Sequence, residues 1–272
     1  MTDTITHPFS DEPIEEVELQ DAPLVKVMAQ LRFPMIAAVS EMAGLTHFQR
    51  ALSHRYPVMR EEKQIAAVMT GEGQVIQTGA GTIRRFHGLA DGWSVSLAPD
   101  WVAIETTEYT VRADFISRWT EVIAALQTLD PSPVVYDRLG VRYVDRLVRA
   151  EANEDLSVLV RSEVLGALVL SEGMSGGSEL VGVFTQAHFR LDNLQLLARW
   201  GRIPASTPVL PGIDPIDEVS WILDIDVFTD ASGTPFLVED VAHASEHAAM
   251  HAYRFFRWAM TDEFIHRHGN QS

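Results

Sequence analysis

The chain has 272 residues, of which 46% are hydrophobic and 22% charged, a composition ordinary for a globular protein with a buried core. Its 38 acidic residues outnumber 21 Lys and Arg, and the formal charge of −17 disfavours broad nucleic-acid or membrane binding and favours a basic partner. The absence of cysteine excludes disulfides, thiolate metal sites and cysteine nucleophiles. No apolar run is long enough to span a membrane, and the N-terminus lacks a signal-peptide pattern, so we expect a cytoplasmic protein.

Residues 1–22 are predicted to form an acidic, disordered tail. Seven acidic residues lie in this stretch without any Lys or Arg, and Pro8 and Pro13 interrupt regular structure. The tail either keeps the protein soluble or docks as an arm on a basic surface of a partner or second subunit.

The first half of the ordered chain, residues 23–130, reads as strand, helix, meander and helix. Apolar residues alternate from Leu24 to Phe33, which predicts a half-buried strand. A helix is expected over 36–56 and five short strands between 65 and 107, with turns that include Gly79-Ala-Gly81. The spacing from Val111 to Leu126 predicts a helix that faces the sheet.

The second half, residues 131–272, repeats this order. A strand over Val134–Val148 matches Leu24–Phe33 at an offset of 110, and we expect a helix over 155–170, strands over 178–191, 194–200 and 220–229, and a closing helix over 239–268. The predicted fold is α+β: duplicated strand–helix–antiparallel meander–helix units that form one compact, curved antiparallel sheet, with long helices on one face. This plan resembles the TATA-binding-protein-like and helix-grip folds, a likeness of form that implies no function.

Several short motifs are spread over the chain: Pro23-Leu24, Gln30-Leu-Arg-Phe33, Tyr56-Pro57, Arg138-Leu-Gly-Val-Arg-Tyr143, His247, Phe255 and Met260-Thr-Asp-Glu-Phe264. In these motifs the chain resembles a sporadically distributed, functionally uncharacterised bacterial family of about this length. The resemblance implies no catalytic residues. The patchy distribution of that family is typical of toxin–antitoxin and phage-defence genes.

Basic residues line one side of the central strand, which is unexpected in so acidic a chain. Arg138, Arg142 and Arg146 share this side, and Arg32 and Lys26 hold equivalent places in the first half. Guanidinium groups of this kind bind a carboxylate or phosphate ligand, or they pair with acidic residues of a neighbouring strand.

Asp224 and Asp226 alternate with apolar residues on one strand. Carboxylates two positions apart can hold magnesium or act as acid and base, and they also form the wet face of an ordinary antiparallel strand. The ligand-binding candidates are therefore Arg32, Arg138, Arg142, Asp224 and Asp226.

Histidines recur every four residues on the closing helix, at positions 243, 247 and 251. Two imidazoles at this spacing can share a metal ion, which makes His243 and His247 the metal candidates. The alternative is a solvated or interface face whose imidazoles respond to pH.

Three functions remain open. The first is a non-enzymatic protein-interaction or regulatory module within a toxin–antitoxin or phage-defence type system, with a basic protein encoded nearby as the candidate partner. The second is a small anionic-ligand-binding protein with a pocket between sheet and helices. The third is an enzyme that uses Asp224 and Asp226 or His243 and His247. We expect no cofactor, no catalytic signature and a homo-oligomer, since exposed sheet edges need covering.

Overall fold

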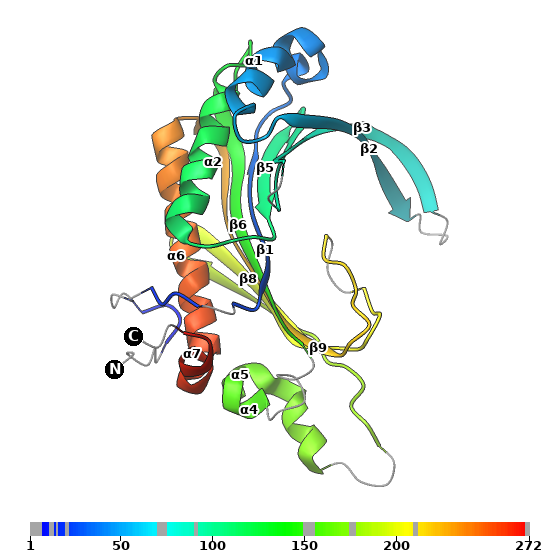
Figure 1. The fold of residues 1–272 in the computed structure, drawn as a ribbon, viewed down its shortest axis with the longest axis vertical. Helices are drawn as coiled ribbons and strands as arrows, with labels where there is room; N and C mark the ends of the chain where they lie inside the picture. The colour runs from blue at the N-terminus through cyan, green and yellow to red at the C-terminus, as the bar shows by residue number, and fades with distance from the viewer. Residues whose placement is uncertain are drawn as a thin grey trace. The chain divides into compact units, whose positions relative to one another are not determined.

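The computed structural model describes residues 7–10, 14, 16–19, 22–69, 75–89, 92–148, 156–173, 178–208 and 212–269 (Figure 1). The elements follow in this order: β1 (Leu24–Arg32), η1 (Ala37–Ser40), α1 (Met42–Leu52), β2 (Val58–Met69), β3 (Val75–His87), β4 (Trp93–Ala98), β5 (Trp101–Thr106), α2 (Arg112–Leu126), β6 (Val135–Val148), α4 (Leu156–Leu159), α5 (Ser162–Leu165), η2 (Gly166–Gly173), β7 (Thr185–Leu191), β8 (Leu194–Ile203), β9 (Ser220–Pro235), α6 (Val238–Ala259) and α7 (Asp262–His268). Within these ranges no helix combines the length and apolar character that crossing a bilayer requires.

Nine strands of the described chain form one open antiparallel sheet in the order β2-β3-β4-β5-β1-β6-β9-β8-β7. The two opening strands, β1 and β6, lie side by side at its middle. Outward from β1 lie β5, β4, β3 and β2, and outward from β6 lie β9, β8 and β7. This order, together with the repeated succession of elements, confirms the predicted α+β fold with duplicated units and an antiparallel sheet. The strands β2 and β7 form its two edges.

Contacts divide the chain into two compact units. The first unit comprises residues 1–27, 141–228 and 247–272, and the second comprises residues 28–140 and 229–246. The strands β1, β6 and β9 and the helix α6 each contribute residues to both units. The repeats at 23–130 and 131–272 concern sequence similarity rather than contacts, and their boundaries remain a prediction.

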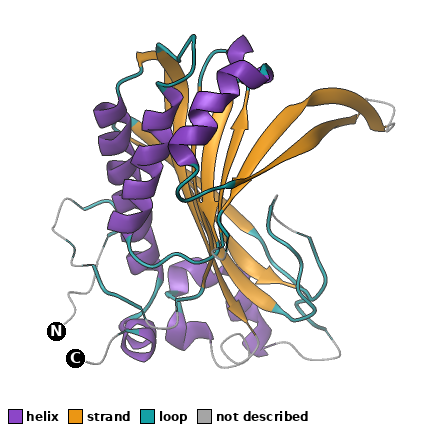
Figure 2. Ribbon diagram, turned by 45° about the horizontal axis from the view of Figure 1, so that its top comes forward, coloured by secondary structure: helices purple, strands orange, loops and turns teal. Residues whose placement is uncertain are grey.

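In the second unit, helices cover strands of the sheet (Figure 2): the ring of Phe48 on α1 lies 5.5 Å from that of Phe86 on β3, and the ring of Phe115 on α2 lies 5.8 Å from that of Trp93 on β4. Phe115, Trp119 and Val122 are completely buried because they recur on one face of α2. The indole Nε1 of Trp119 donates a hydrogen bond of 2.9 Å to Oγ of Ser245, a residue of α6 that belongs to the same unit. Burial of a polar indole therefore leaves no unsatisfied donor at this position.

The first unit packs the second half of α6 against β7 and β8. The ring of Phe255 lies 5.9 Å from that of Phe189 on β7 and 6.4 Å from that of Trp200 on β8. Apolar residues of β8 are buried at every second position, as a strand with one covered face requires.

The described part of the N-terminal segment also packs on the first unit. The ring of Phe9 lies 4.9 Å from that of Phe189, and Nη1 of Arg254 donates a 2.8 Å hydrogen bond to the carbonyl oxygen of Ser10. The amide of Val17 donates to the hydroxyl of Tyr253 at 2.7 Å. The prediction of a disordered tail otherwise concerns residues outside the described ranges.

Several predicted element boundaries are wrong. Gly79 and Gly81 lie within β3 rather than in a turn, opposite a register shift between Lys63 and Ile65 of β2, where a bulge favours small residues. The helix expected over 36–56 consists of η1 and α1, and the helix expected over 155–170 consists of α4, α5 and η2. The strand expected over 178–191 begins only at Thr185, as β7.

The closing helix is also not continuous. It ends at Ala259, and a new helix, α7, begins after Thr261, whose side-chain oxygen accepts a hydrogen bond from the amide of Phe264. Thr261 is thus an N-cap, a role for which threonine is well suited.

Candidate functional site

A row of polar side chains crosses four strands of the first unit, and the carboxylate of Asp224 lies at its centre. Asp224 on β9 is paired in register with Arg199 on β8, which in turn is paired with Gln186 on β7. Arg142 approaches the same carboxylate from β6. Alternation along each strand places all four side chains on one face of the sheet.

Asp224 accepts hydrogen bonds from both arginines and has no exposed surface. Its Oδ1 lies 2.6 Å from Nε of Arg142, and its Oδ2 lies 3.2 Å from Nη2 of Arg142 and 2.8 Å from Nη1 of Arg199. Nε of Arg199 donates to Oε1 of Gln186 at 3.0 Å. A buried carboxylate of this kind is tolerated only because charged donors replace the water that it has lost.

Arg142 pairs with Asp224 across the strands, as one of the two alternatives for the basic residues of the central strand predicts. Arg199 and Gln186 were not among the predicted residues. The sequence pattern could have identified Arg199, because this residue alternates along β8 with apolar residues that are buried.

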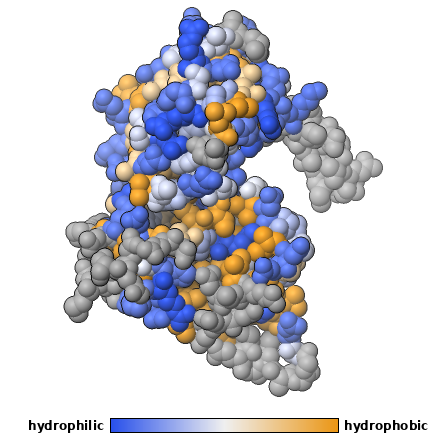
Figure 3. All heavy atoms as spheres, in the orientation of Figure 1, coloured by the Kyte–Doolittle hydropathy of each residue, from blue (hydrophilic) through white to orange (hydrophobic). Residues whose placement is uncertain are grey.

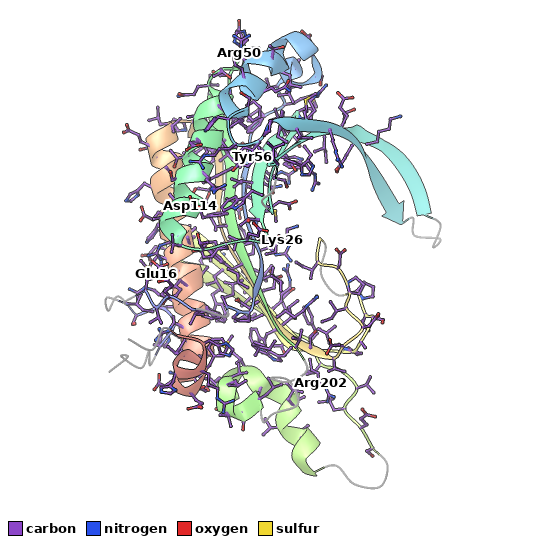
Figure 4. All side chains as sticks on the ribbon, viewed as in Figure 1. Glu16, Lys26, Arg50, Tyr56, Asp114 and Arg202 are labelled. Carbon is purple, nitrogen blue, oxygen red and sulfur yellow. The ribbon has the colours of Figure 1, made fainter. Side chains whose placement is uncertain are left out.

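Other basic residues of the first unit bind loop carbonyl groups. Arg146 Nη1 donates to the oxygen of Asp214 at 3.0 Å, Lys26 Nζ to that of Gly212 at 3.3 Å, and Arg202 Nη1 to that of Leu180 at 3.2 Å (Figure 4). Burial lowers the pKa of Arg146, and the nearby Asp214 opposes this effect. These cations fix the loops that follow η2 and β8.

The remaining ligand-binding candidates do not all share a unit. Arg32 belongs to the second unit, where its Nη2 lies 3.5 Å from Oδ2 of Asp100 in an exposed ion pair. Arg138, which is half-buried, also belongs to the second unit, whereas Asp226, half-buried as well, belongs to the first. Ligand binding by this set remains a prediction.

Asp145 on β6 is a second buried carboxyl group of the first unit. It alternates to the side of β6 opposite Arg142 and has 4% of its surface exposed. Burial in the first place, and the charge of Asp224 in the second, raise its pKa to about 8. Titratable groups with such displaced pKa values occur at functional sites and also in structural charge networks.

Arg257 on α6 is a buried cation. It has 5% of its surface exposed, and its Nε and Nη1 atoms have no hydrogen-bond partner among the described residues.

The metal candidates His243 and His247 both have exposed side chains. The described ranges contain no group of three or more His, Asp or Glu that could hold a metal ion. His247 instead lies in ring contact with His251, with centroids 4.7 Å apart. Metal binding by His243 and His247 remains a prediction.

Comparisons of the chain with protein-family models, with curated proteins and with solved structures found no match.

Proposed function

We propose that this chain is a non-enzymatic protein-interaction module that binds a partner polypeptide at the open edge of β7. The observation that carries the proposal is a set of exposed apolar side chains on the two segments that adjoin the start of this strand. Val181 and Phe184, which precede β7, are 62% and 43% exposed, and Val169 and Leu170 of η2 are 52% and 67% exposed. Exposed apolar groups gathered in this way mark interaction sites more often than isolated ones do.

This apolar surface rests on a fixed backbone. The amide of Val183 donates a 3.1 Å hydrogen bond to the carbonyl oxygen of Arg202, so the segment before β7 runs beside the end of β8. Gly201 permits this approach, because a Cβ atom there would lie 1.9 Å from the carbonyl oxygen of Val183. Gly166, at the start of η2, lies against Thr185 at the start of β7. Val181 and Phe184 are thus held on a fixed backbone segment, which lowers the entropic cost of binding.

The edge itself supplies the other half of the binding surface. The strand β7 is the last in the sheet order, and no described strand pairs with its outer side. Its amide and carbonyl groups can add an extended partner segment, while apolar side chains next to the strand select the sequence. Figure 3 shows hydrophobic residues, interrupted by hydrophilic ones, over the region of β8 and β9 on the visible face.

The charge of the chain favours a basic partner. With a formal charge of −17, the protein attracts a cationic polypeptide at long range and repels nucleic acid. The resemblance to a sporadically distributed bacterial family suggests that the partner is encoded nearby, in a toxin–antitoxin or phage-defence type system. In the absence of that partner, the same edge is open to a second copy.

Photo-crosslinking tests the proposal. A crosslinking amino acid at position 184 of the full chain, co-expressed with the products of neighbouring genes, should form one covalent product with a partner protein. The control is position 89, since Leu89 is 82% exposed and lies in the second unit. The proposal fails if position 184 yields no product, or if both positions yield the same one.

A substitution checks the same surface without a crosslinker. Phe184→Asp places a charge where an apolar contact is expected and should weaken partner binding by roughly tenfold or more. Leu89→Asp should leave binding unchanged, and both variants should retain the circular-dichroism spectrum of the parent chain.

A further inference from the structure

Two histidines on consecutive turns of α6 direct their Nε2 atoms toward each other. Nε2 of His247 lies 3.3 Å from Nε2 of His251, whereas the ring centroids lie 4.7 Å apart. The nitrogen ends are therefore closer together than the ring centres, and the two imidazoles converge. Spacing by four residues produces this arrangement because such side chains share one helix face.

We propose that His247 and His251 form a two-histidine site for a divalent transition-metal ion that prefers tetrahedral coordination, as Zn²⁺ does. A tetrahedral ion with metal–nitrogen bonds of about 2.05 Å requires two donor nitrogens roughly 3.3 Å apart. The observed separation of 3.3 Å meets this requirement without movement of the helix. A square-planar ion would require roughly 2.9 Å, which makes the site less suited to that geometry.

The surroundings leave room for the other ligands. His247 is exposed and His251 is half-buried, so water can complete the coordination sphere. The next cation along this helix, Arg254, directs Nη1 to the carbonyl oxygen of Ser10 at 2.8 Å. The site uses a pair of nitrogen ligands, which is consistent with the lack of a larger cluster in the described ranges.

The same geometry permits a hydrogen bond in which one ring donates to the other. Metal binding replaces that shared hydrogen with the ion, and both rings then carry their hydrogen on Nδ1. The metal site is independent of the β7 surface, so either proposal can fail alone.

Titration of the full chain, purified without a histidine tag, tests the inference. Zn²⁺ alone is followed by calorimetry, and Co²⁺ alone by the visible absorption that reports tetrahedral coordination. We expect saturable binding of one ion per chain. His247→Gln and His251→Gln should each weaken it by roughly tenfold or more, since even outer-shell partners contribute ten- to a hundredfold.

His266→Gln is the matched control, because it changes an exposed histidine on a different helix, α7, and should leave the affinity unchanged. Circular dichroism establishes that all three variants keep their helices. The inference is overturned if the parent chain binds no stoichiometric ion, if His266→Gln weakens binding as much as His247→Gln, or if His251→Gln has no effect.

Discussion

The carboxyl group of Asp145 is held in a setting where its charged form is unfavourable. Burial, and then repulsion by Asp224, raise its pKa from 3.8 to about 8. The folded chain therefore keeps this group protonated at neutral pH, whereas the unfolded chain ionises it. Folding takes up a proton under these conditions, so stability contributed by the protonated group is lost as pH rises toward 8.

Asp145→Asn should remove this pH dependence. Between about pH 5 and pH 8 the variant should gain stability relative to the parent chain, by up to about 1.4 kcal/mol per pH unit, and the difference should then level off. Chemical denaturation at several pH values measures the effect. Asp192→Asn, in the exposed turn between β7 and β8, is the control and should follow the parent curve. A constant difference between Asp145→Asn and the parent at all pH values would contradict the prediction.

The alternation of residues along the strands predicted part of the arrangement around Asp224 and Asp145. Opposite charges on two predicted strands were sufficient to anticipate the pair of Arg142 and Asp224. Arg199 could not be placed beside them, because the long connection from Ile203 to Ser220 leaves the register of β8 and β9 open. The burial of Asp145 depends on which face of β6 is covered, and that is a property of packing rather than of local sequence.

At the scale of elements, periodicity identified the strands and the long helices well but misplaced their ends. Alternation of apolar residues specified β1 and β8, in which buried and less buried positions largely alternate. The glycines of β3 resembled turn residues, since glycine serves bulges and turns equally. The break before α7 depends on the cap at Thr261, a local interaction that hydrophobic spacing does not report.

Phe9 is one of the described N-terminal residues that hold this segment on the first unit. Phe9→Ala removes its contacts with Phe189 and Phe255 and should cost this segment about 1 to 2 kcal/mol of docking free energy. A Glu-specific protease should then cleave at Glu16 and Glu18 faster than in the parent chain, as mass spectrometry can follow.

Ser10→Ala is the control for this experiment, because Arg254 binds the backbone oxygen of residue 10 and not its hydroxyl. Its cleavage rate should match that of the parent chain. Equal rates in the Phe9→Ala variant would show that the aromatic contacts do not hold the segment.

At the scale of the whole molecule, the repeated order of elements explains why the sheet has two open edges. Each half adds its strands outward from β1 or β6, so the sheet grows in both directions and does not close. Edge strands that remain uncovered favour association with other chains. The net charge of −17 opposes the association of two copies, because like charges repel over roughly one Debye length.

The open edges and the net charge together predict that self-association increases as salt is added. If two copies meet through the apolar surface beside β7, added salt screens their repulsion and leaves the apolar contact intact. The dimer fraction measured by light scattering should rise between about 50 mM and 500 mM NaCl, where the Debye length falls from roughly 14 to 4 Å. Phe184→Asp should lower that fraction at every salt concentration. A dimer that dissociates as salt is added would instead be held by ion pairs, and its interface would have to lie elsewhere on the chain.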